Sequence, residues 1–414
     1  MRRRVVVTGL GAVTPVGNDV ATTWRALQEG VSGAALITKF DATSFPVRFA
    51  CEVKGFDPLK FMERKEAKRA DVYTQYAVTA AVEAMADAGL SQGGYDVDRT
   101  GVIVGSGIGG LKTFEEQHDI YRERGASKIS PFFVPMHIVD IAAGVVSMRF
   151  NARGPNYATV SACSTSAHAI GEGFRTIAYG DADIIIAGGA EASVTPMAIA
   201  GFANMTALSE RNDSPATASR PFEKNRDGFV MGEGAGIVIL EALEHALERG
   251  ARIYGEIVGY RATGDAYHLT GQLPEHEGLQ RAMRGAMADA GLTPADVDYV
   301  NAHGTSTPLN DSNEAKAIAT VFGDDASRIS ISSTKSMTGH MLGAAGGVEF
   351  IAATLALRDQ VIPPTINYCV PDPECGDLDF TPNTLKRREL RAALSNSAGF
   401  GGHNVSLVVQ RYTE

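Results

Sequence analysis

Short apolar runs and longer segments with helical spacing alternate along the whole chain. The apolar runs predict strands at 4–8, 101–104, 156–161, 183–187 and 235–240, and again at 253–259, 297–302, 329–333, 391–395 and 405–410. Between them, the spacing of apolar residues predicts helices that include 72–88, 166–177, 275–290 and 349–357. Strands that alternate with helices predict an α/β chain whose mostly parallel sheets are covered by helices on both faces.

The same plan occurs twice in the sequence. In the first half a strand ending in VSA leads into CSTSAHAIGEG and a helix, and in the second half ISIS leads into STKSMTGHMLGAAGG and a helix. Each half also ends with a Gly-rich turn before an apolar strand, GEGAGIVILEA and GFGGHNVSLVV. A repeat of about 200 residues is much longer than a solenoid repeat. We therefore expect one domain over 1–414 made of two related halves, 1–250 and 251–414, with a boundary at 249–251.

The charge balance excludes several classes of partner. Lys and Arg total 38 against 48 Asp and Glu, which gives a net charge of −10. Nucleic-acid-binding domains and membrane-binding basic segments have the opposite balance, so we expect neither partner. The apolar run at the N-terminus is too short for a signal peptide, and no stretch of about 18 apolar residues predicts a membrane span. The four cysteines are too scattered for a disulfide framework, so we expect reduced thiols and a cytoplasmic protein.

The segment GSGIGG at 105–110 matches the Gly-rich fingerprint of dinucleotide-binding proteins directly after a predicted strand. That fingerprint also needs a second strand ending in an acidic residue, whereas this chain continues into LKTFEEQHDIYRERG and SPFFVP. A tight strand-to-helix turn is the simpler interpretation. A nicotinamide-dependent reductase stays open as a remote alternative.

Cys163 stands between the predicted strand YATVSA and a helix opened by small residues. Free N–H groups and a partial positive charge at a helix N-terminus favour the thiolate form of such a cysteine. The same N–H groups can hold the oxyanion that forms when a thioester carbonyl is attacked. A small buried hydrophobic residue is the commoner role of a free cysteine, and the placement of Cys163 alone leaves both interpretations open.

Two of the nine histidines follow predicted strands in the second half. His303 lies in NAHGTSTPLND, and His340 lies in SSTKSMTGHMLGAAGG before a Gly- and Ala-rich helix. Neither has the spacing of a metal site. Two neutral imidazoles facing a thiolate suggest acyl-transfer chemistry in which hydrogen-bond donors stabilise an enolate. Five others, His118, His137, His168, His245 and His276, are expected to be surface or packing residues.

These segments together resemble the β-ketoacyl-[acyl-carrier-protein] synthase family of the thiolase superfamily, and in particular the type II enzymes of bacterial fatty acid synthesis. The matching motifs run from residue 4 to residue 410 in the order of the family. They are VVVTGLGAVTPVGN, GPNYATVSACSTSAHAIG, ASRPFEKNRDGFVMGEGAG, GDAYH, NAHGTSTPLND, SSTKSMTGHMLGAAG and NSAGFGGHN.

The resemblance implies a cysteine–histidine–histidine condensing enzyme that performs a decarboxylative Claisen condensation. Cys163 would carry the acyl group, and His303 and His340 would stabilise the enolate formed from malonyl-[acyl-carrier-protein]. The N–H groups of Cys163 and Phe400 would form the oxyanion hole. Lys335 and Glu349 match supporting residues of the family and are expected to tune His340. Two further sets match the family: the acyl-pocket residues Ile108, Phe202 and Phe400, and the pantetheine-binding residues Thr305 and Thr307.

The resemblance also implies a five-layer αβαβα fold and a homodimer. It implies no redox cofactor and no catalytic metal, and it allows a structural Na⁺ or K⁺ near Asn301, Glu349 and Asn396. A type I-like synthase and a ketosynthase of a polyketide pathway stay open as alternatives. Ala398 stands where the family usually has a larger apolar residue, so the preferred acyl length is open.

An acyl carrier protein is the implied partner, and carrier proteins of the family are acidic. An acidic enzyme must therefore concentrate cations where the carrier protein docks. The sequence offers a first basic cluster, Lys65, Lys68 and Arg69, at helical spacing, and a second basic cluster that includes Arg124 and Lys128. Thr206 stands where the family often has another Arg, which weakens one side of the expected patch.

Overall fold

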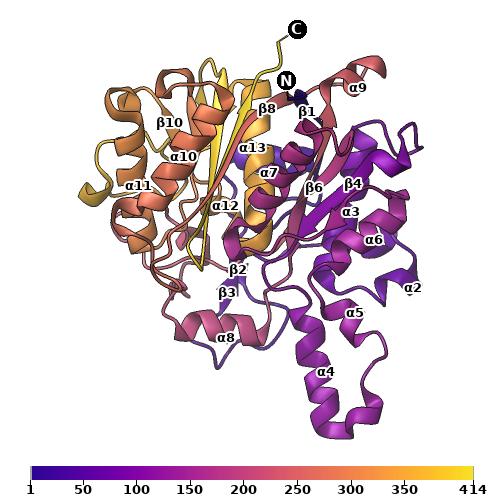
Figure 1. Ribbon diagram of the computed structural model, residues 1–414. Helices are drawn as coiled ribbons and strands as arrows, with labels where there is room; N and C mark the ends of the chain where they lie inside the picture. Colours follow the sequence, from indigo (N-terminus) through magenta and orange to yellow (C-terminus); the bar gives the residue numbers. More distant parts are fainter. Residues whose placement is uncertain (1, 414) are drawn as a thin grey trace.

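The computed structural model describes residues 2–413, in which ten strands form one mixed sheet (Figure 1). The order across the sheet is β10-β9-β13-β14-β8-β1-β7-β6-β4-β5. Every predicted strand overlaps one of these strands. Their bounds are β1 (Val5–Val13), β4 (Thr100–Gly105), β5 (Asn156–Tyr157), β6 (Ile184–Glu191), β7 (Gly234–Ala242), β8 (Gly255–Gly264), β9 (Tyr299–Asn301), β10 (Ser330–Ser332), β13 (Ala392–Gly399) and β14 (His403–Gln410).

The strand order repeats within the sheet. The first five strands along the chain lie in the spatial order first-fifth-fourth-second-third, and the last five lie in the same order. An antiparallel pairing of β1 with β8 joins the two sets. This repeat confirms the two related halves. The halves meet in the connection between α9 (Leu243–Glu248) and β8, and their boundary as separate units stays a prediction.

The expectation of mostly parallel strands is wrong. Only the pairs β4–β5, β4–β6, β9–β10 and β9–β13 are parallel. The first strand of each half is antiparallel to the fifth, and the fifth is antiparallel to the fourth. The reason in the second half is the tight turn after β13, which returns the chain as β14 without a crossover helix.

Helices divide the molecule into five layers. The central layer consists of α7 (Thr165–Ala178) and α13 (Ala345–Asp359), which contact strands of both halves and each other. In Figure 1, α3 (Val72–Asp87) and α6 (Ile141–Phe150) cover the first half, and α10 (Glu277–Ala290) and α11 (Pro308–Phe322) cover the second. This arrangement confirms the αβαβα fold. The other helices are α1 (Val20–Glu29), α2 (Arg64–Ala67), α4 (Leu111–Arg124), α5 (Phe133–His137), α8 (Pro196–Asn204) and α12 (Lys335–Thr338).

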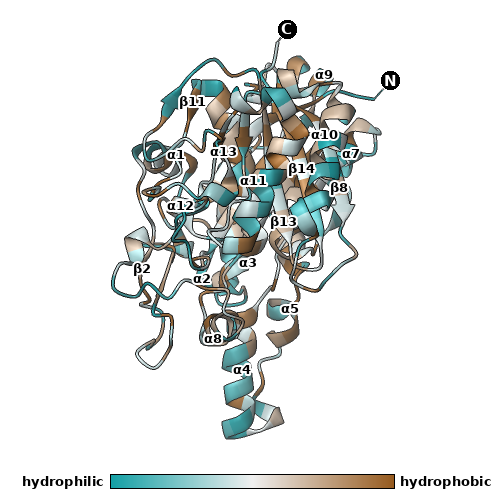
Figure 2. Ribbon diagram, turned by 90° about the vertical axis from the view of Figure 1, so that its left-hand side faces the viewer, coloured by the Kyte–Doolittle hydropathy of each residue, from teal (hydrophilic) through white to brown (hydrophobic). Residues whose placement is uncertain are grey.

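The smaller elements lie outside the main sheet. The strands β2 (Ala35–Leu36) and β3 (Phe49–Ala50) pair with each other, as do β11 (Val361–Ile362) and β12 (Lys386–Arg387). Short 3₁₀ turns η4 (Ala162–Ser164) and η9 (Leu342–Ala344) lead into the two central helices. Between β4 and α5, α4 forms one arm of a hairpin that projects from the body, and its residues are mostly hydrophilic (Figure 2). No helix within residues 2–413 is both long and apolar enough to cross a membrane.

Two boundaries differ from the sequence pattern. The strand β1 continues through Gly9 and Gly11 because the backbone of α3 packs directly on it, and a Cβ on Gly11 would lie 1.9 Å from a carbonyl oxygen of α3. The helix α13 begins at Ala345, so Glu349 lies one turn inside it rather than at its start. Because α13 is apolar on all sides, its first turn carries no amphipathic signal.

Candidate active site

Cys163 lies in the turn η4 at the start of the central helix α7. The preceding residue, Ala162, has a positive φ of 50°, which turns the chain sharply before the cysteine. The hydroxyl of Ser164 donates to the carbonyl of His403, which ties this turn to the beginning of β14. Cys163 is buried in an apolar cluster with Ile108, Phe202 and Leu342 among its members.

The thiol environment differs from the sequence expectation of a resting thiolate. Burial raises the pKa of Cys163 to about 12, against the charge of Lys335 and the N–H groups of Phe400 and Cys163, which lower it. Burial therefore opposes the thiolate form that the start of a helix was expected to favour. The two N–H groups that approach the sulfur are those that the family resemblance assigns to the oxyanion hole.

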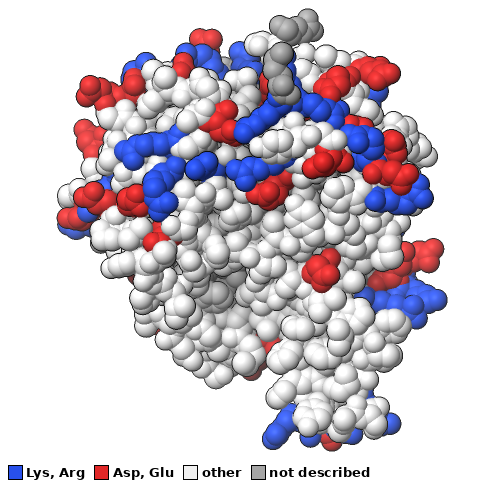
Figure 3. All heavy atoms as spheres, in the orientation of Figure 1, with Lys and Arg blue, Asp and Glu red and all other residues white. Residues whose placement is uncertain are grey.

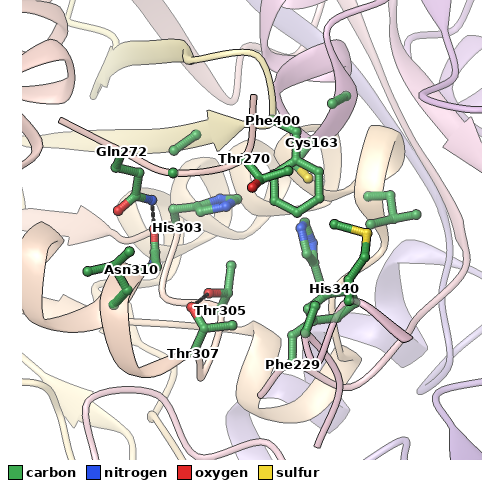
Figure 4. A pocket seen from close by; sticks show the side chains of 18 of the residues that line it. Cys163, Phe229, Thr270, Gln272, His303, Thr305, Thr307, Asn310, His340 and Phe400 are labelled. Atoms are coloured by element: carbon green, nitrogen blue, oxygen red, sulfur yellow. Dashed lines mark hydrogen bonds between the residues drawn. The ribbon is translucent and has the colours of Figure 1, made fainter. Parts of the chain in front are cut away.

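The structure brings both candidate histidines to the same pocket as the cysteine (Figure 4). The ring centroids of His303 and His340 are 5.3 Å apart, with the ring planes at 87°. His303 follows β9, and His340 follows α12, where its N–H donates to the carbonyl of Val230 at 2.7 Å. The edge-on ring of Phe229, 5.3 Å from His340, closes one side.

Both imidazoles are neutral. Burial and the charge of Lys335 hold the pKa values of His303 and His340 well below the ordinary range. The buried Lys335 pairs with Glu349, and its Nζ lies 2.6 Å from the carbonyl oxygen of His303 and 3.3 Å from Nδ1 of the same ring. If Nδ1 accepts from the ammonium, the ring proton of His303 lies on Nε2 and is available to the pocket.

Lys335 contacts His303 directly and reaches His340 only through its charge. The charge of Lys335 acts on His340 as expected, and the direct contact with His303 is an addition to that expectation. The local reason is that α12 begins at Lys335 and its side chain extends across to the chain end of β9.

Two buried carboxylates that the sequence reasoning missed also support the histidine segment. Glu314 accepts from the backbone N–H groups of His303 at 2.8 Å and Gly304 at 2.7 Å, and burial raises its pKa to about 7. Asp311 accepts from the N–H of Ser306 at 3.1 Å. Both acids follow His303 in NAHGTSTPLNDSNEAK, on the first turns of α11. The sequence carries a signal for these two acids: a Pro opens the helix, and acidic residues in its first turns face back toward the preceding loop.

The pocket has a volume of about 650 Å³. Every residue that was predicted to bind substrate lines it, and so does Ala398. One side is apolar and the opposite side is polar, where the hydroxyls of Thr305 and Thr307 are 2.9 Å apart and Gln272 donates to Asn310 at 2.6 Å. The predicted lining residues are Ile108, Cys163, Phe202, His303, Thr305, Thr307, His340 and Phe400.

The residues expected near a monovalent cation include two buried oxygens that lack hydrogen-bond partners within residues 2–413, Oδ1 of Asn301 and Oε2 of Glu349. Oδ1 of Asn396 instead accepts from the hydroxyl of Ser406 at 2.8 Å. Unpartnered oxygens are ligands that hard cations prefer, so the donors fit Na⁺ or K⁺. The described part of the chain contains no group of three or more His, Cys, Asp or Glu side chains able to hold a metal.

The two basic clusters lie on the surface and away from the pocket lining. The helix α2 is a single turn with Lys68 as its C-cap, so Arg69 lies outside the helical face on which the first basic cluster was expected. Arg69 instead stacks its guanidinium 4.2 Å from the ring of Phe132. Arg124 and Lys128 lie at the tip of the α4 hairpin, where cations gather at the bottom of Figure 3. Docking at either cluster stays a prediction.

The repeated halves, the central helices and a cysteine and two histidines in one pocket define a protein of the thiolase-like class. The chain belongs to the β-ketoacyl synthase family: the family model of the N-terminal domain matches residues 2–246, and that of the C-terminal domain matches residues 254–369.

Similar proteins cover the chain almost completely. It is 53% identical over 410 residues to a 3-oxoacyl-[acyl-carrier-protein] synthase 2 of Staphylococcus aureus (strain N315), with 99% of each chain covered. The protein of the same name from Synechocystis sp. is 52% identical over 411 residues, with the same coverage. Among solved structures, the AntDE ketosynthase of a type II PKS, in complex with its acyl-carrier protein AntF and bound to a hexaketide, superposes with a TM-score of 0.91 at 37% identity, over 100% of both chains.

Proposed function

We propose that this protein is a condensing enzyme of fatty acid biosynthesis that makes 3-oxoacyl-[acyl-carrier-protein] from an acyl-[acyl-carrier-protein] and malonyl-[acyl-carrier-protein]. The observation that carries the proposal is the convergence of one thiol and two neutral imidazoles on a largely apolar pocket. The names of the relatives above 50% identity support the same reaction and favour it over a polyketide pathway, for which the similarity is 37%.

In the first step the sulfur of Cys163 attacks the carbonyl carbon of the acyl thioester. The N–H groups of Cys163 and Phe400, which already approach the sulfur, stabilise the oxyanion. Collapse of the intermediate breaks the bond to the carrier-protein sulfur, which leaves as a thiol with the proton of Cys163. The acyl group is then held as a thioester on the enzyme.

In the second step the malonyl thioester loses CO₂, and the electron pair of the broken C–C bond forms an enolate. Its oxygen accepts hydrogen bonds from the neutral rings of His303 and His340, which act as donors where negative charge develops. The enolate carbon attacks the acyl carbonyl, the C–C bond forms, and the sulfur of Cys163 leaves as a thiolate, which takes up one proton from solvent to restore the thiol. The product is two carbons longer and remains on the carrier protein.

We propose that Lys335 and Glu349 act through the histidines. The Lys335 charge keeps both rings neutral and its ammonium orients His303, and Glu349 balances that charge inside the protein. A Na⁺ or K⁺ held by Asn301, Glu349 and Asn396 would add positive charge behind the same residues. The reaction needs no redox cofactor or catalytic metal, because loss of CO₂ drives the condensation.

An acyl carrier protein is the proposed partner. The solved ketosynthase complex with AntF shows this type of partner for a structural relative. The hydroxyls of Thr305 and Thr307 are placed to bind the pantetheine arm that delivers the thioester. We also propose a cytoplasmic location, which the scattered cysteines support.

We also propose a homodimer formed through the outer edge of β5. This strand ends the sheet and pairs only with β4 among the described residues, so its other edge can pair with a second copy. Exposed apolar side chains surround it, among them Met148 at 73%, Val160 at 58% and Tyr157 at 41% exposure. Clustered exposure of this kind marks an interface.

Substitution of the nucleophile tests the function. Cys163→Ala removes the sulfur but fits the same apolar cluster, so we expect a folded protein that neither becomes acylated nor elongates acyl-[acyl-carrier-protein]. Intact-protein mass spectrometry measures acylation, and product analysis measures elongation. Elongation at the normal rate by this variant would show that the assignment is wrong.

A further inference from the structure

The Gly-rich segment GSGIGG binds a carboxylate of the protein itself. It forms the turn between β4 and α4, and Glu191, the last residue of the neighbouring strand β6, is fully buried beneath it. The Glu191 carboxylate accepts five hydrogen bonds. The donors are Ser106 Oγ at 2.8 Å, the N–H of Gly107 at 2.8 Å, the N–H of Ile108 at 3.3 Å, Ser193 Oγ at 3.2 Å and the N–H of Gly343 at 3.0 Å.

This arrangement explains why the dinucleotide fingerprint does not mark a cofactor site here. Such a loop binds phosphate with its backbone N–H groups. In this protein the N–H groups of Gly107 and Ile108 already bind the Glu191 carboxylate. A phosphate would have to displace a buried side chain from these donors.

Glu191 joins segments that form the apolar side of the pocket. Ile108 comes from the Gly-rich turn, and Leu342 comes from η9, whose next residue donates to Glu191. The junction has no spare room: a Cβ on Gly343 would lie 2.3 Å from the nitrogen of Gly107, and a Cβ on Gly107 would lie 2.8 Å from a Glu191 oxygen. A shift of the Glu191 carboxylate would therefore also move Ile108 and Leu342, the two residues that it joins on the apolar side of the pocket.

The charge of Glu191 has an unusual environment. No Lys, Arg or His pairs with it within residues 2–413, and burial raises its pKa. A buried carboxylate without a cation destabilises the protein unless hydrogen bonds satisfy it. The five donors to Glu191 come from three separate segments of the chain. Because all of them must reach the same carboxylate, these hydrogen bonds hold the three segments in one relative position.

We propose that Glu191 is a positioning residue that fixes Ile108 and Leu342 and thereby sets the acyl chain lengths that the enzyme accepts. The proposal rests on the proposed function and names the structural basis of its specificity. One methylene in an apolar pocket changes substrate preference by about tenfold or more only if the pocket walls hold their positions. A buried carboxylate with five donors provides that rigidity.

The test compares Glu191→Gln with a matched control, Glu241→Gln. Glu241 is equally buried, but it lies in β7 outside the pocket lining and pairs with Arg249 at 2.6 Å. Glutamine keeps the shape of Glu191 and turns an amide donor toward N–H groups. Condensation is measured with saturated acyl-carrier proteins of graded length, and thermal unfolding verifies that both variants fold.

We expect Glu191→Gln to reduce the discrimination between acyl chains that differ by two carbons from about tenfold to less than about threefold, mainly through KM for the acyl substrate. Glu241→Gln should keep the wild-type length profile even if its stability falls. An unchanged profile in Glu191→Gln, or an equal change in both variants, would overturn the proposal.

A milder variant covers the case in which Glu191→Gln does not fold. Ser106→Ala removes one donor to Glu191 and should change the length profile in the same direction by a smaller factor. A wild-type profile in this folded variant would also overturn the proposal.

Acylation of Cys163 by one thioester is measured in parallel. A wild-type enzyme that is never acylated would contradict the proposed function, whereas an acylated enzyme with an unaltered profile in the variants contradicts only the role of Glu191.

Discussion

His340→Ala should slow decarboxylation of malonyl-[acyl-carrier-protein] by about 10²–10³. In the structure the two rings, 5.3 Å apart at 87°, line one pocket. Loss of one preorganised donor to a developing oxyanion raises the barrier by about 2.7–4 kcal/mol, and each 1.4 kcal/mol is about tenfold in rate. Truncation also leaves space beside Phe229 that water can enter, so the observed effect should lie near the lower end.

The assay follows CO₂ release from malonyl-[acyl-carrier-protein] and, separately, acylation of Cys163 by an acyl thioester. We expect acylation to change by less than about threefold, because His340 acts on the enolate rather than on the first oxyanion. Equal losses in both steps would show that His340 acts by supporting the fold of the site. A decarboxylation rate within about threefold of the wild type would refute its role as a donor.

The pH dependence gives an independent check of the same reasoning. Because the pKa values of His303 and His340 lie well below the ordinary range, both rings stay neutral from about pH 6 to pH 8. Decarboxylation by the wild-type enzyme should therefore not fall as the pH drops across this range. Burial raises the pKa of Glu314 to about 7, so this carboxyl titrates in the same range. A decline with a midpoint near an ordinary histidine pKa that persists in a Glu314→Gln variant would contradict neutral donors.

Three other outcomes can be measured directly. Lys335→Met should lower the free energy of unfolding by about 3–5 kcal/mol in urea titrations, because it leaves Glu349 buried without its cation. Adding Glu349→Gln should recover part of this loss. A double variant no more stable than the single variant would contradict the reasoning. Exchange of the first basic cluster for Glu should raise KM for carrier-protein substrates but not for a minimal pantetheine thioester, and equal effects on both would argue against docking there. Val160→Asp should convert a dimer to a monomer in light scattering, whereas a monomeric wild type would disprove the interface.

Much of the fold was accessible from the sequence because most strands of the main sheet contain a short apolar run. The direction of the strands was not, since the pattern of 391–395 and 405–410 is the same for a hairpin and for a crossover unit. The extra length of β1 was missed for a local reason: Gly9 and Gly11 look like turn residues, but they are there because α3 packs on the strand.

The residues of the candidate site likewise divide into those that the sequence could indicate and those that it could not. Cys163 and His303 could be found because their residue types and their positions after predicted strands already indicate chemistry. The expected strand-end position of His340 is wrong, because the helix α12 lies between β10 and this residue. Glu191 could not, because its distant partners include backbone N–H groups 83 to 152 residues away, and such donors leave no trace in residue identity. Glu314 was missed although it lies only 11 residues after His303. Lys335 was found, but its contact with His303 depends on tertiary packing.

The site combines Cys163 of the first half with two histidines of the second half, which has a consequence for how activity is acquired during folding. The hydroxyl of Ser166, near the start of α7, accepts from the N–H of Gly347 in α13, 181 residues further along the chain, at 2.8 Å. Contacts at this sequence separation form slowly, because closing a long chain segment is entropically unfavourable. Cys163 precedes Ser166 in the chain, whereas both histidines lie between Ser166 and Gly347. Each half can acquire secondary structure before the pocket exists, so the regain of activity after refolding reports the docking of one half on the other.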